Sequence, residues 1–235
     1  MSTFSKAMSL TKSDLKISLR RSESLLVTVL MPIIVLIAFS FTDGGVDKYL
    51  PFIFVQSTMA TALLSLGITN GFDRRYRVLV RLGTTPIGKR GIVLSKIIYV
   101  FILETFQLLL IGGIGVALRY RPGAAALLAF PFCWLASISF ASLALIISSN
   151  LKAETNLGVQ NLTYLLLLGI SSVSFTTTTD NELFKLVKLL PSSALHSLVR
   201  YAAELQNFPI AAFISLAIFG ILLTLIAIRT FKFDE

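Results

Sequence analysis

The sequence predicts an all-α membrane protein with six transmembrane helices, and three observations support this fold class. First, 55% of the 235 residues are hydrophobic and only 14% are charged, whereas soluble domains carry about 25% charged residues. Second, the apolar residues gather in six runs. Each run is close in length to the about 20 residues that a helix needs to cross the hydrocarbon core. Third, the cations lie in short intervals between these runs, which is typical of membrane topology and not of nucleic-acid binding.

Residues 1–235 are expected to form one transmembrane domain, because no internal repeat, linker or second domain is visible. The first apolar run follows a long basic segment and precedes no small-residue cleavage site, so it predicts a retained span and not a signal peptide. The single cysteine, Cys133, lies in an apolar run. This placement excludes a disulfide framework and a CxxC metal or redox motif.

Residues 4–23 predict an amphipathic helix at the membrane surface, ahead of the first span. Its apolar and cationic side chains recur at helical spacings on two faces: Phe4, Met8, Leu15 and Leu19 on one, and Lys12, Lys16 and Arg20 on the other. A helix of this kind lies in the interface plane with its cations toward anionic headgroups. The alternative is a basic flank that anchors the first span.

The six predicted spans set the orientation of the chain. They cover residues 24–41, 50–69, 92–118, 124–148, 156–175 and 208–228. With the N-terminus inside, the cytoplasmic segments hold fifteen of the 21 Lys and Arg residues, and the outer loops hold six. The positive-inside rule therefore places both termini, and the basic loop at residues 72–91, in the cytoplasm.

The long outer loop before the last span predicts two short amphipathic helices over residues 180–204, separated by Pro191. Apolar side chains alternate with polar ones at helical spacing on either side of the proline. Ser192, His196, Arg200 and Glu204 form the polar face of the second helix, opposite Leu195, Leu198, Val199 and Ala202. Such a pair is typical of a segment that dips into the outer leaflet or lies on it. The alternative is a loosely ordered surface loop.

A near match to a nucleotide-binding P-loop occurs in the basic loop, where Gly83, Gly88 and Lys89 have the required spacing. A P-loop needs Ser or Thr next, to hold magnesium, and this chain has Arg90. We therefore expect no ATP hydrolysis by this chain. No cofactor motif or metal-ligand spacing occurs elsewhere in the sequence.

The third predicted span contains one acid, Glu104, and Gln107 follows one turn later. Polar groups at this depth are costly and usually face a bundle interior or a water-filled cavity. Both residues are therefore candidates for lining a transport pathway, and a secondary transporter that uses Glu104 is an alternative function. A packed glutamate satisfied by a neighbouring helix is the other interpretation. Gly67 and Gly71 in the second span permit close helix approach.

An intramembrane serine protease is a further alternative that six spans allow. It needs a hydroxyl nucleophile and a histidine base within hydrogen-bond reach inside the bundle. The one histidine, His196, is predicted on the polar face of the outer loop, and Ser171 lacks the G-x-S-x-G context. The sequence therefore does not favour this activity.

The order of parts resembles that of the ABC-2 type exporter permeases, which include the daunorubicin-resistance group. The local resemblance lies in Asp73-Arg74-Arg75, Arg81-Leu82-Gly83, Thr84-Thr85-Pro86 and Leu94-Ser95-Lys96. The chain departs from the family at residues 76–79, Tyr-Arg-Val-Leu, where members usually carry glutamates and a Gly-Thr. This loop is therefore more cationic than the family pattern.

The resemblance implies the transmembrane subunit of an ATP-driven exporter of an amphipathic substrate, such as a drug, lipid, glycolipid or peptide. Its implied partners are two copies of an ATP-binding subunit, which would hold the ATP and magnesium, a second permease copy in a homodimer, and membrane lipid. No nucleic acid is implied. The expected location is the cell membrane of a bacterium, with both termini in the cytoplasm.

The resemblance also implies the candidate site. Residues 72–86 would form a cytoplasmic coupling helix, residues 4–23 the elbow helix, and residues 180–204 the outer helices that gate substrate exit. The candidates for binding the ATP-binding subunit are Asp73, Arg74, Arg75, Arg77, Arg81, Leu82, Thr85 and Pro86. The candidates for the outer gate are Glu182, Lys185, Pro191, His196 and Arg200.

Overall fold

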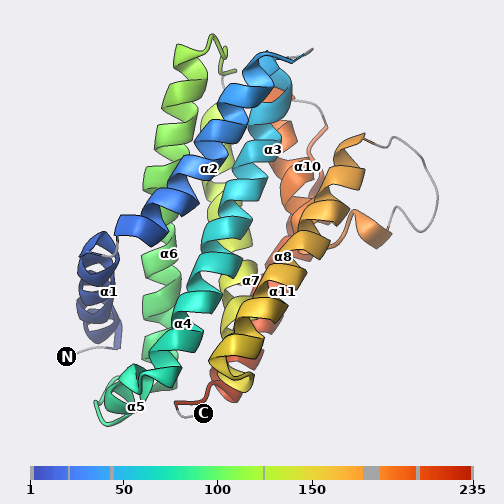
Figure 1. The fold of residues 1–235 in the computed structure, drawn as a ribbon. Coiled ribbons are helices and arrows are strands. Elements are labelled where there is room, and N and C mark those ends of the chain that lie inside the picture. Colours follow the sequence, from blue (N-terminus) through green and yellow to red (C-terminus); the bar gives the residue numbers. More distant parts are fainter. Residues whose placement is uncertain are drawn as a thin grey trace.

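A computed structural model of the chain describes residues 3–20, 22–42, 45–123, 125–176, 186–204 and 207–233. These residues form helices that run side by side as a bundle, and no strand occurs among them (Figure 1). The α-helices are α1 (Thr3–Arg20), α2 (Ser22–Ser40), α3 (Gly45–Met59), α4 (Leu66–Arg75), α5 (Val78–Gly83), α6 (Gly88–Ala117), α7 (Ala129–Asn150), α8 (Ala153–Thr176), α10 (Pro191–Glu204) and α11 (Ile210–Thr230). A π-helical segment, η1 (Ala60–Ser65), joins α3 to α4, and a 3-10 turn, η2 (Ala126–Leu128), precedes α7. The predicted all-α class is confirmed.

Four helices in the described part of the chain are long and apolar enough to cross a membrane: Gly45–Arg75, Gly88–Ala117, Ala126–Asn150 and Ile210–Thr230. They correspond to the predicted spans at residues 50–69, 92–118, 124–148 and 208–228. The other two predicted spans correspond to α2 and α8. In α2 the residues from Thr28 to Ser40 are apolar, and α8 has 24 residues but includes Asn156 and Gln160.

The second span is longer than the sequence predicted, because α3, η1 and α4 form one continuous helix over Gly45–Arg75. The helix continues through Asp73, Arg74 and Arg75, which the sequence assigned to a separate loop helix. Cations are favourable in the last turn of a helix, where they face the negative end of the helix dipole. The basic residues therefore end the span and do not interrupt it.

The helix α7 lies against α4, α6, α10 and α11 and forms the centre of the packing. Its buried face alternates small residues such as Ala136 and Ala144 with the large ring of Phe140. Two hydroxyl groups on α7 also tie it to α11: Ser139 Oγ donates to Leu216 O at 3.3 Å, and Ser142 Oγ lies 2.8 Å from Thr224 Oγ1. Small residues and interhelical hydrogen bonds hold helices together in lipid, where burial of apolar side chains contributes little.

The α5 segment, the first turn of α1 and the segment that follows α11 lie toward one end of the bundle, while the connection between α6 and α7 lies at the other (Figure 1). The helix α10 lies in the opposite half of the bundle, packed on α3, α7, α8 and α11.

The helix α1 packs on α6 in the half nearest α5, and Leu15 of the predicted apolar stripe is partly buried against the core. Its fully buried residues are Ala7 and Thr11, and Thr11 Oγ1 donates to Ser95 O at 3.0 Å. Phe4 and Ile17 point outward and are exposed. In a bilayer the apolar side chains gain nothing by turning inward, whereas small polar residues allow close contact and hydrogen bonds between helices.

Candidate functional site

The connection between α4 and α6 is divided into parts, and the prediction of one coupling helix over residues 72–86 is wrong. The helix α4 ends at Arg75, and Arg77 has a left-handed backbone conformation with φ 57°. The short helix α5 follows over Val78–Gly83. A left-handed residue turns the chain out of the right-handed helix, so α5 points in a new direction from the end of the span.

Arg74 is a structural residue and does not belong to the exposed surface, contrary to the sequence prediction. Its side chain is buried, and Nη1 donates to the backbone oxygen of Ser148 at 2.6 Å. Asn70 Nδ2 donates to Ser148 Oγ at 2.8 Å. Ser148 lies in the last turn of α7, where the backbone carbonyls have no intrahelical partner and favour a cation. Arg74 therefore fixes α4 to the end of α7.

Lys96 joins three helices through a buried ion cluster. Its Nζ lies 3.2 Å from Oδ2 of Asp73 on α4 and 3.2 Å from Oδ2 of Asp14 on α1, and the Lys96 side chain is only 4% exposed. A buried charge is tolerated only when its partners compensate the lost hydration. Asp73, predicted to contact a partner subunit, is therefore engaged inside this chain.

The sequence analysis missed the role of Lys96, which it treated only as part of the motif that opens the third span. A lysine within an apolar helix is itself a signal that a counter-charge lies nearby. The signal does not say which acid supplies that charge. Asp14 and Asp73 come from different helices, and only the packing of α1 and α4 on α6 brings them together.

Arg75 forms an ion pair with Glu154 at the start of α8. Both side chains are exposed, and exposed pairs of this kind contribute about 0–1 kcal/mol to stability. Arg75 therefore remains accessible from the surface.

The helix α5 rests on its own protein through one face. Leu79 is fully buried, and a Cβ at Gly83 would lie 3.2 Å from the Phe233 ring of the C-terminal segment. In the segment that follows α5, Pro86 O accepts a hydrogen bond from Lys6 Nζ of α1 at 2.9 Å. The candidate residue Leu82 is partly buried and packs against the hydrophobic core that contains Leu79. These contacts fix α5 to α1 and to the end of α11.

The Thr-Thr pair of the family motif closes the end of α5. Thr84 Oγ1 donates to Arg81 O at 2.7 Å, and Thr85 Oγ1 donates to Leu82 O at 2.6 Å. Both carbonyls also accept from the backbone N–H of the same threonine, so each hydroxyl adds a second hydrogen bond at the helix C-terminus. Thr85 therefore has a capping role within this chain.

The other face of the segment around α5 is exposed. Its exposed residues are Tyr76, Arg77, Val80 and Arg81.

Gly67 and Gly71 face two buried amides of α8. Asn156 Nδ2 donates to Gly67 O at 2.9 Å, and Gln160 Nε2 donates to Ala144 O of α7 at 3.0 Å. A Cβ at Gly67 would lie 2.1 Å from Gln160 Nε2, and one at Gly71 would lie 2.3 Å from Asn156 Nδ2. The two glycines therefore leave the space in which α8 hydrogen-bonds to α4 and α7.

Glu104 and Gln107 connect helices inside the chain. Glu104 is fully buried and accepts a hydrogen bond from Ser137 Oγ at 2.5 Å. Gln107 Oε1 accepts from Thr61 Oγ1 of the π-helical segment at 2.5 Å, and Gln107 Nε2 donates to Thr28 O at 3.0 Å. Gln107 is therefore satisfied by neighbouring helices, whereas Glu104 is satisfied through Oε2 only, because its Oε1 is buried without a hydrogen-bond partner among the described residues.

The helix α10 begins at Pro191, as the sequence predicted, but its polar face is wrongly assigned. Ser192 and His196 are buried together with Leu195, because α10 is packed on several sides by α3, α7, α8 and α11. Arg200 remains exposed and pairs with Glu204 at 2.9 Å. The gate candidates Glu182 and Lys185 lie outside the described residues.

His196 does not form a catalytic pair with Ser171. The Ser171 hydroxyl is buried and has no hydrogen-bond partner among the described residues. Burial lowers the pKa of His196 to about 4, and the nearby Arg200 adds to the effect, so the imidazole is neutral at pH 7. The described part of the chain also contains no cluster of His, Cys, Asp and Glu that could hold a metal ion.

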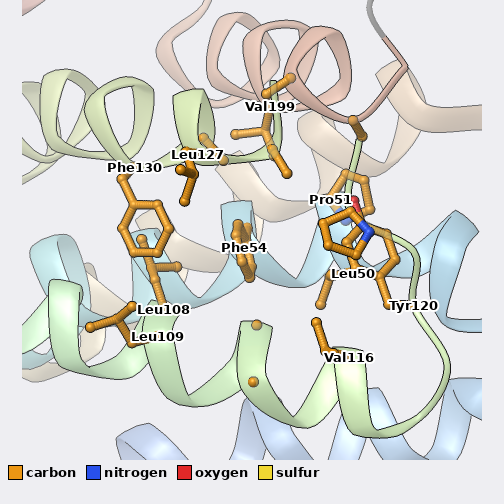
Figure 2. A pocket seen from close by; sticks show the side chains of 17 residues that line it. Leu50, Pro51, Phe54, Leu108, Leu109, Val116, Tyr120, Leu127, Phe130 and Val199 are labelled. Atoms are coloured by element: carbon orange, nitrogen blue, oxygen red, sulfur yellow. The ribbon is translucent and has the colours of Figure 1, made fainter. Parts of the chain in front are cut away.

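A pocket of about 320 Å³ lies between α3, α6, α7 and α10 (Figure 2). Its walls are apolar and include Phe54, Leu108, Phe130 and Val199. Glu104 and Gln107 do not line it. The predicted pathway residues and this pocket are therefore separate features.

These features define a multi-pass membrane protein of the permease class: apolar helices tied by buried polar contacts, with a basic segment anchored at one end. The chain belongs to the ABC-2 type transporter family, whose model matches residues 6–202. The predicted resemblance is confirmed. A comparison with curated proteins found no significant match. Permeases of this family are typically not catalytic themselves and normally work with an ATP-binding subunit.

Proposed function

We propose that this chain is the membrane subunit of an ATP-driven exporter and that α5 couples it to a separate ATP-binding subunit. The observation that carries the proposal is the exposed surface formed by Tyr76, Arg77, Val80 and Arg81 around α5, which is held on the protein by the buried Leu79. Exposed aromatic and arginine side chains on a rigid base are typical of interaction sites.

The anchoring contacts provide a path from α5 to the spans. The ion cluster of Asp14, Asp73 and Lys96 joins α1, α4 and α6. Lys6 adds a hydrogen bond from α1 to the segment that follows α5. A displacement of α5 by the partner would therefore move these three helices together. Such rigid-body movement is one way in which transporters exchange two arrangements.

The complete transporter contains two copies of this chain and two ATP-binding subunits, which hold the ATP and magnesium. The helices α2 and α8 complete six spans, and both termini lie in the cytoplasm with α5. Exposed apolar residues along α2 and α8, among them Met31, Ile34, Leu162 and Leu165, support their contact with lipid or with the second copy. The family resemblance supports an amphipathic substrate, such as a drug, lipid, glycolipid or peptide.

Charge reversal of the exposed arginines is expected to release the ATP-binding subunit. In Arg77→Glu/Arg81→Glu, two cations of the coupling surface become acids, and retention of the partner should fall at least about tenfold, equivalent to about 1.4 kcal/mol. Co-purification of an ATP-binding subunit from the native membrane measures this. Arg229→Glu, at an exposed site in the last turn of α11, is the control and should retain the partner. If no ATP-binding subunit associates with the unaltered chain, the proposed function is wrong.

The alternative secondary transporter depends on Glu104 and predicts a different result. Because the amide oxygen of a glutamine at this position would still accept the hydrogen bond from Ser137, we expect Glu104→Gln to fold and to support ATP hydrolysis by the assembled complex at the unaltered rate. Glu104→Leu should lower the free energy of unfolding by about 1–3 kcal/mol, since it leaves the Ser137 hydroxyl buried without its acceptor. ATP hydrolysis and thermal unfolding in detergent are the measurements. Transport that is driven by a proton gradient without ATP, and that loses its pH dependence in Glu104→Gln, would favour the alternative.

A further inference from the structure

The apolar pocket between α3, α6, α7 and α10, here the α10 pocket, is a built feature of the bundle. Leu50 and Phe54 of α3, Leu108 of α6, Phe130 of α7 and Val199 of α10 point toward one volume of about 320 Å³ (Figure 2). This volume is at the lower end of the about 300–1,000 Å³ typical of small-molecule sites. The helix α10 forms one wall, so an occupant contacts the helix that the sequence analysis placed in the outer gate.

Two glycines of α6 make the pocket. A Cβ at Gly113 would meet no atom within 4 Å, and one at Gly112 would only touch the Phe54 ring at 3.6 Å. Elsewhere the glycines of the second span leave space that the amides of α8 fill. At Gly112 and Gly113 the space that side chains would otherwise occupy is left as part of the pocket.

The chemistry of the lining selects a hydrocarbon occupant. Among the described residues no charged side chain lines the pocket, and the Tyr120 hydroxyl is the one polar side-chain group of its described lining. A water molecule needs two to four polar partners to be held in a cavity, and apolar cavities stay dry. Gly113, Val116 and Leu127 at its edge are exposed, so the pocket opens on the side where a spanning helix meets lipid chains.

The charges beside the pocket select an anionic headgroup. Tyr120 lies between Arg119 and Arg121, both of which are exposed. Asp47, in the first turn of α3, accepts a hydrogen bond from the Arg121 backbone N–H at 3.4 Å. The next residue, Lys48, is exposed. The three cations outnumber the one acid, so the end of the pocket is positively charged. Arginine forms strong, two-point hydrogen bonds with phosphate oxygens.

We infer that the α10 pocket binds one acyl chain of an anionic phospholipid, whose phosphate lies at Arg119 and Arg121. The acyl chain fills a volume that the protein's own side chains leave empty. This binding requires no ATP-binding subunit, so the inference stands independently of the proposed function. The bound acyl chain would contact α10 through Val199, Ala202 and Ala203, which line the pocket.

The test uses the purified full-length chain in lipid nanodiscs with photoreactive lipids. A phosphatidylglycerol with a diazirine in one acyl chain is the probe, and a phosphatidylcholine with the same chain is its zwitterionic counterpart, which has no net charge. After illumination, mass spectrometry maps the labelled peptides. We expect labelling by phosphatidylglycerol to concentrate in the peptides that contain Leu108–Val116 and Leu127–Phe130, and labelling by phosphatidylcholine to be several-fold weaker there.

Gly113→Phe fills the pocket and should reduce the concentrated labelling several-fold. Gly158→Phe is the matched control, because Gly158 is also an exposed helical glycine whose Cβ would meet no atom within 4 Å. It should leave the labelling unchanged. Labelling spread evenly over the lipid-facing helices, or unaffected by Gly113→Phe, would overturn the inference.

Arg119→Gln/Arg121→Gln tests the headgroup contact separately. The variant should lower labelling by phosphatidylglycerol to the level of phosphatidylcholine. Thermal unfolding of the variant in detergent, compared with the unaltered chain, verifies that it is folded. Equal labelling by the two lipids in the unaltered chain would contradict the assignment of an anionic headgroup.

Discussion

Lys96→Met is expected to lower the free energy of unfolding by about 3–5 kcal/mol, the usual cost of removing one partner from a buried ion cluster. The methionine side chain has nearly the volume of lysine but carries no charge. Asp14 and Asp73 would then face each other across α1 and α4 without the Nζ that lies 3.2 Å from both. Unfolding in detergent, followed by loss of helical signal with denaturant, measures the change.

Two further variants separate the charge from the packing. Asp14→Asn/Asp73→Asn/Lys96→Met removes all three charges and should recover most of the lost stability, because the carboxylates no longer repel. Lys89→Met changes an exposed lysine in the first turn of the same helix and should shift stability by less than about 0.5 kcal/mol. Equal stabilities of Lys96→Met and Lys89→Met would show that the cluster does not hold the three helices together.

Gly67→Ala is expected to destabilise the fold by about 2 kcal/mol, although alanine favours helices more than glycine does. The new methyl would lie 2.1 Å from Gln160 Nε2, so the buried amide must leave Ala144 O and lose its hydrogen bond. A buried polar group without its partner costs about 1–3 kcal/mol. Unfolding in detergent, followed by loss of helical signal with denaturant, measures this change in the free energy of unfolding.

The matched control for this substitution is Gly158→Ala on α8, where a Cβ would meet no atom within 4 Å. This change should leave stability unchanged or raise it by up to about 1 kcal/mol through helix propensity. Gly67→Ala/Gln160→Ala removes the clashing amide, and the double variant should be more stable than the sum of the single effects predicts. Additive effects would mean that Gly67 and Gln160 do not contact each other.

The helical class, four of the spans and the family could be predicted from the sequence, because each depends on composition along the chain. An apolar run of about 20 residues is sufficient to indicate a span, and α6, α7 and α11 lie close to the predicted ranges. The motif at Thr84-Thr85-Pro86 indicated the family, and the structure gives the two hydroxyls a local role at the end of α5.

The division of the basic loop into buried and exposed residues could not be predicted. Arg74 and Arg75 are neighbours with the same chemistry, yet one is buried against the end of α7 and the other is exposed. Which of them faces inward depends on how α4 is rotated, and the π-helical segment at Ala60–Ser65 sets that rotation. No residue pattern in the loop itself carries this information.

The buried face of α10 was mispredicted for a related reason. Helical periodicity separates the apolar and polar faces of a helix, but it does not say what each face contacts. In α1, Phe4 is exposed, while Leu15 of the same stripe is partly buried against the core and Thr11 packs on α6. In α10 the neighbouring helices enclose both stripes, so His196 is buried with Leu195.

The polar amides of α8 bear on how the chain is made. Asn156 and Gln160 weaken the tendency of a single nascent helix to leave the translocation channel for the bilayer. Only Leu151 and Lys152 separate α7 from α8, so the two helices are close enough to leave the channel as a hairpin. Gln160 would then already donate to Ala144 O within that hairpin. Asn156 would complete the assembly when it binds Gly67 O of the earlier-inserted α4.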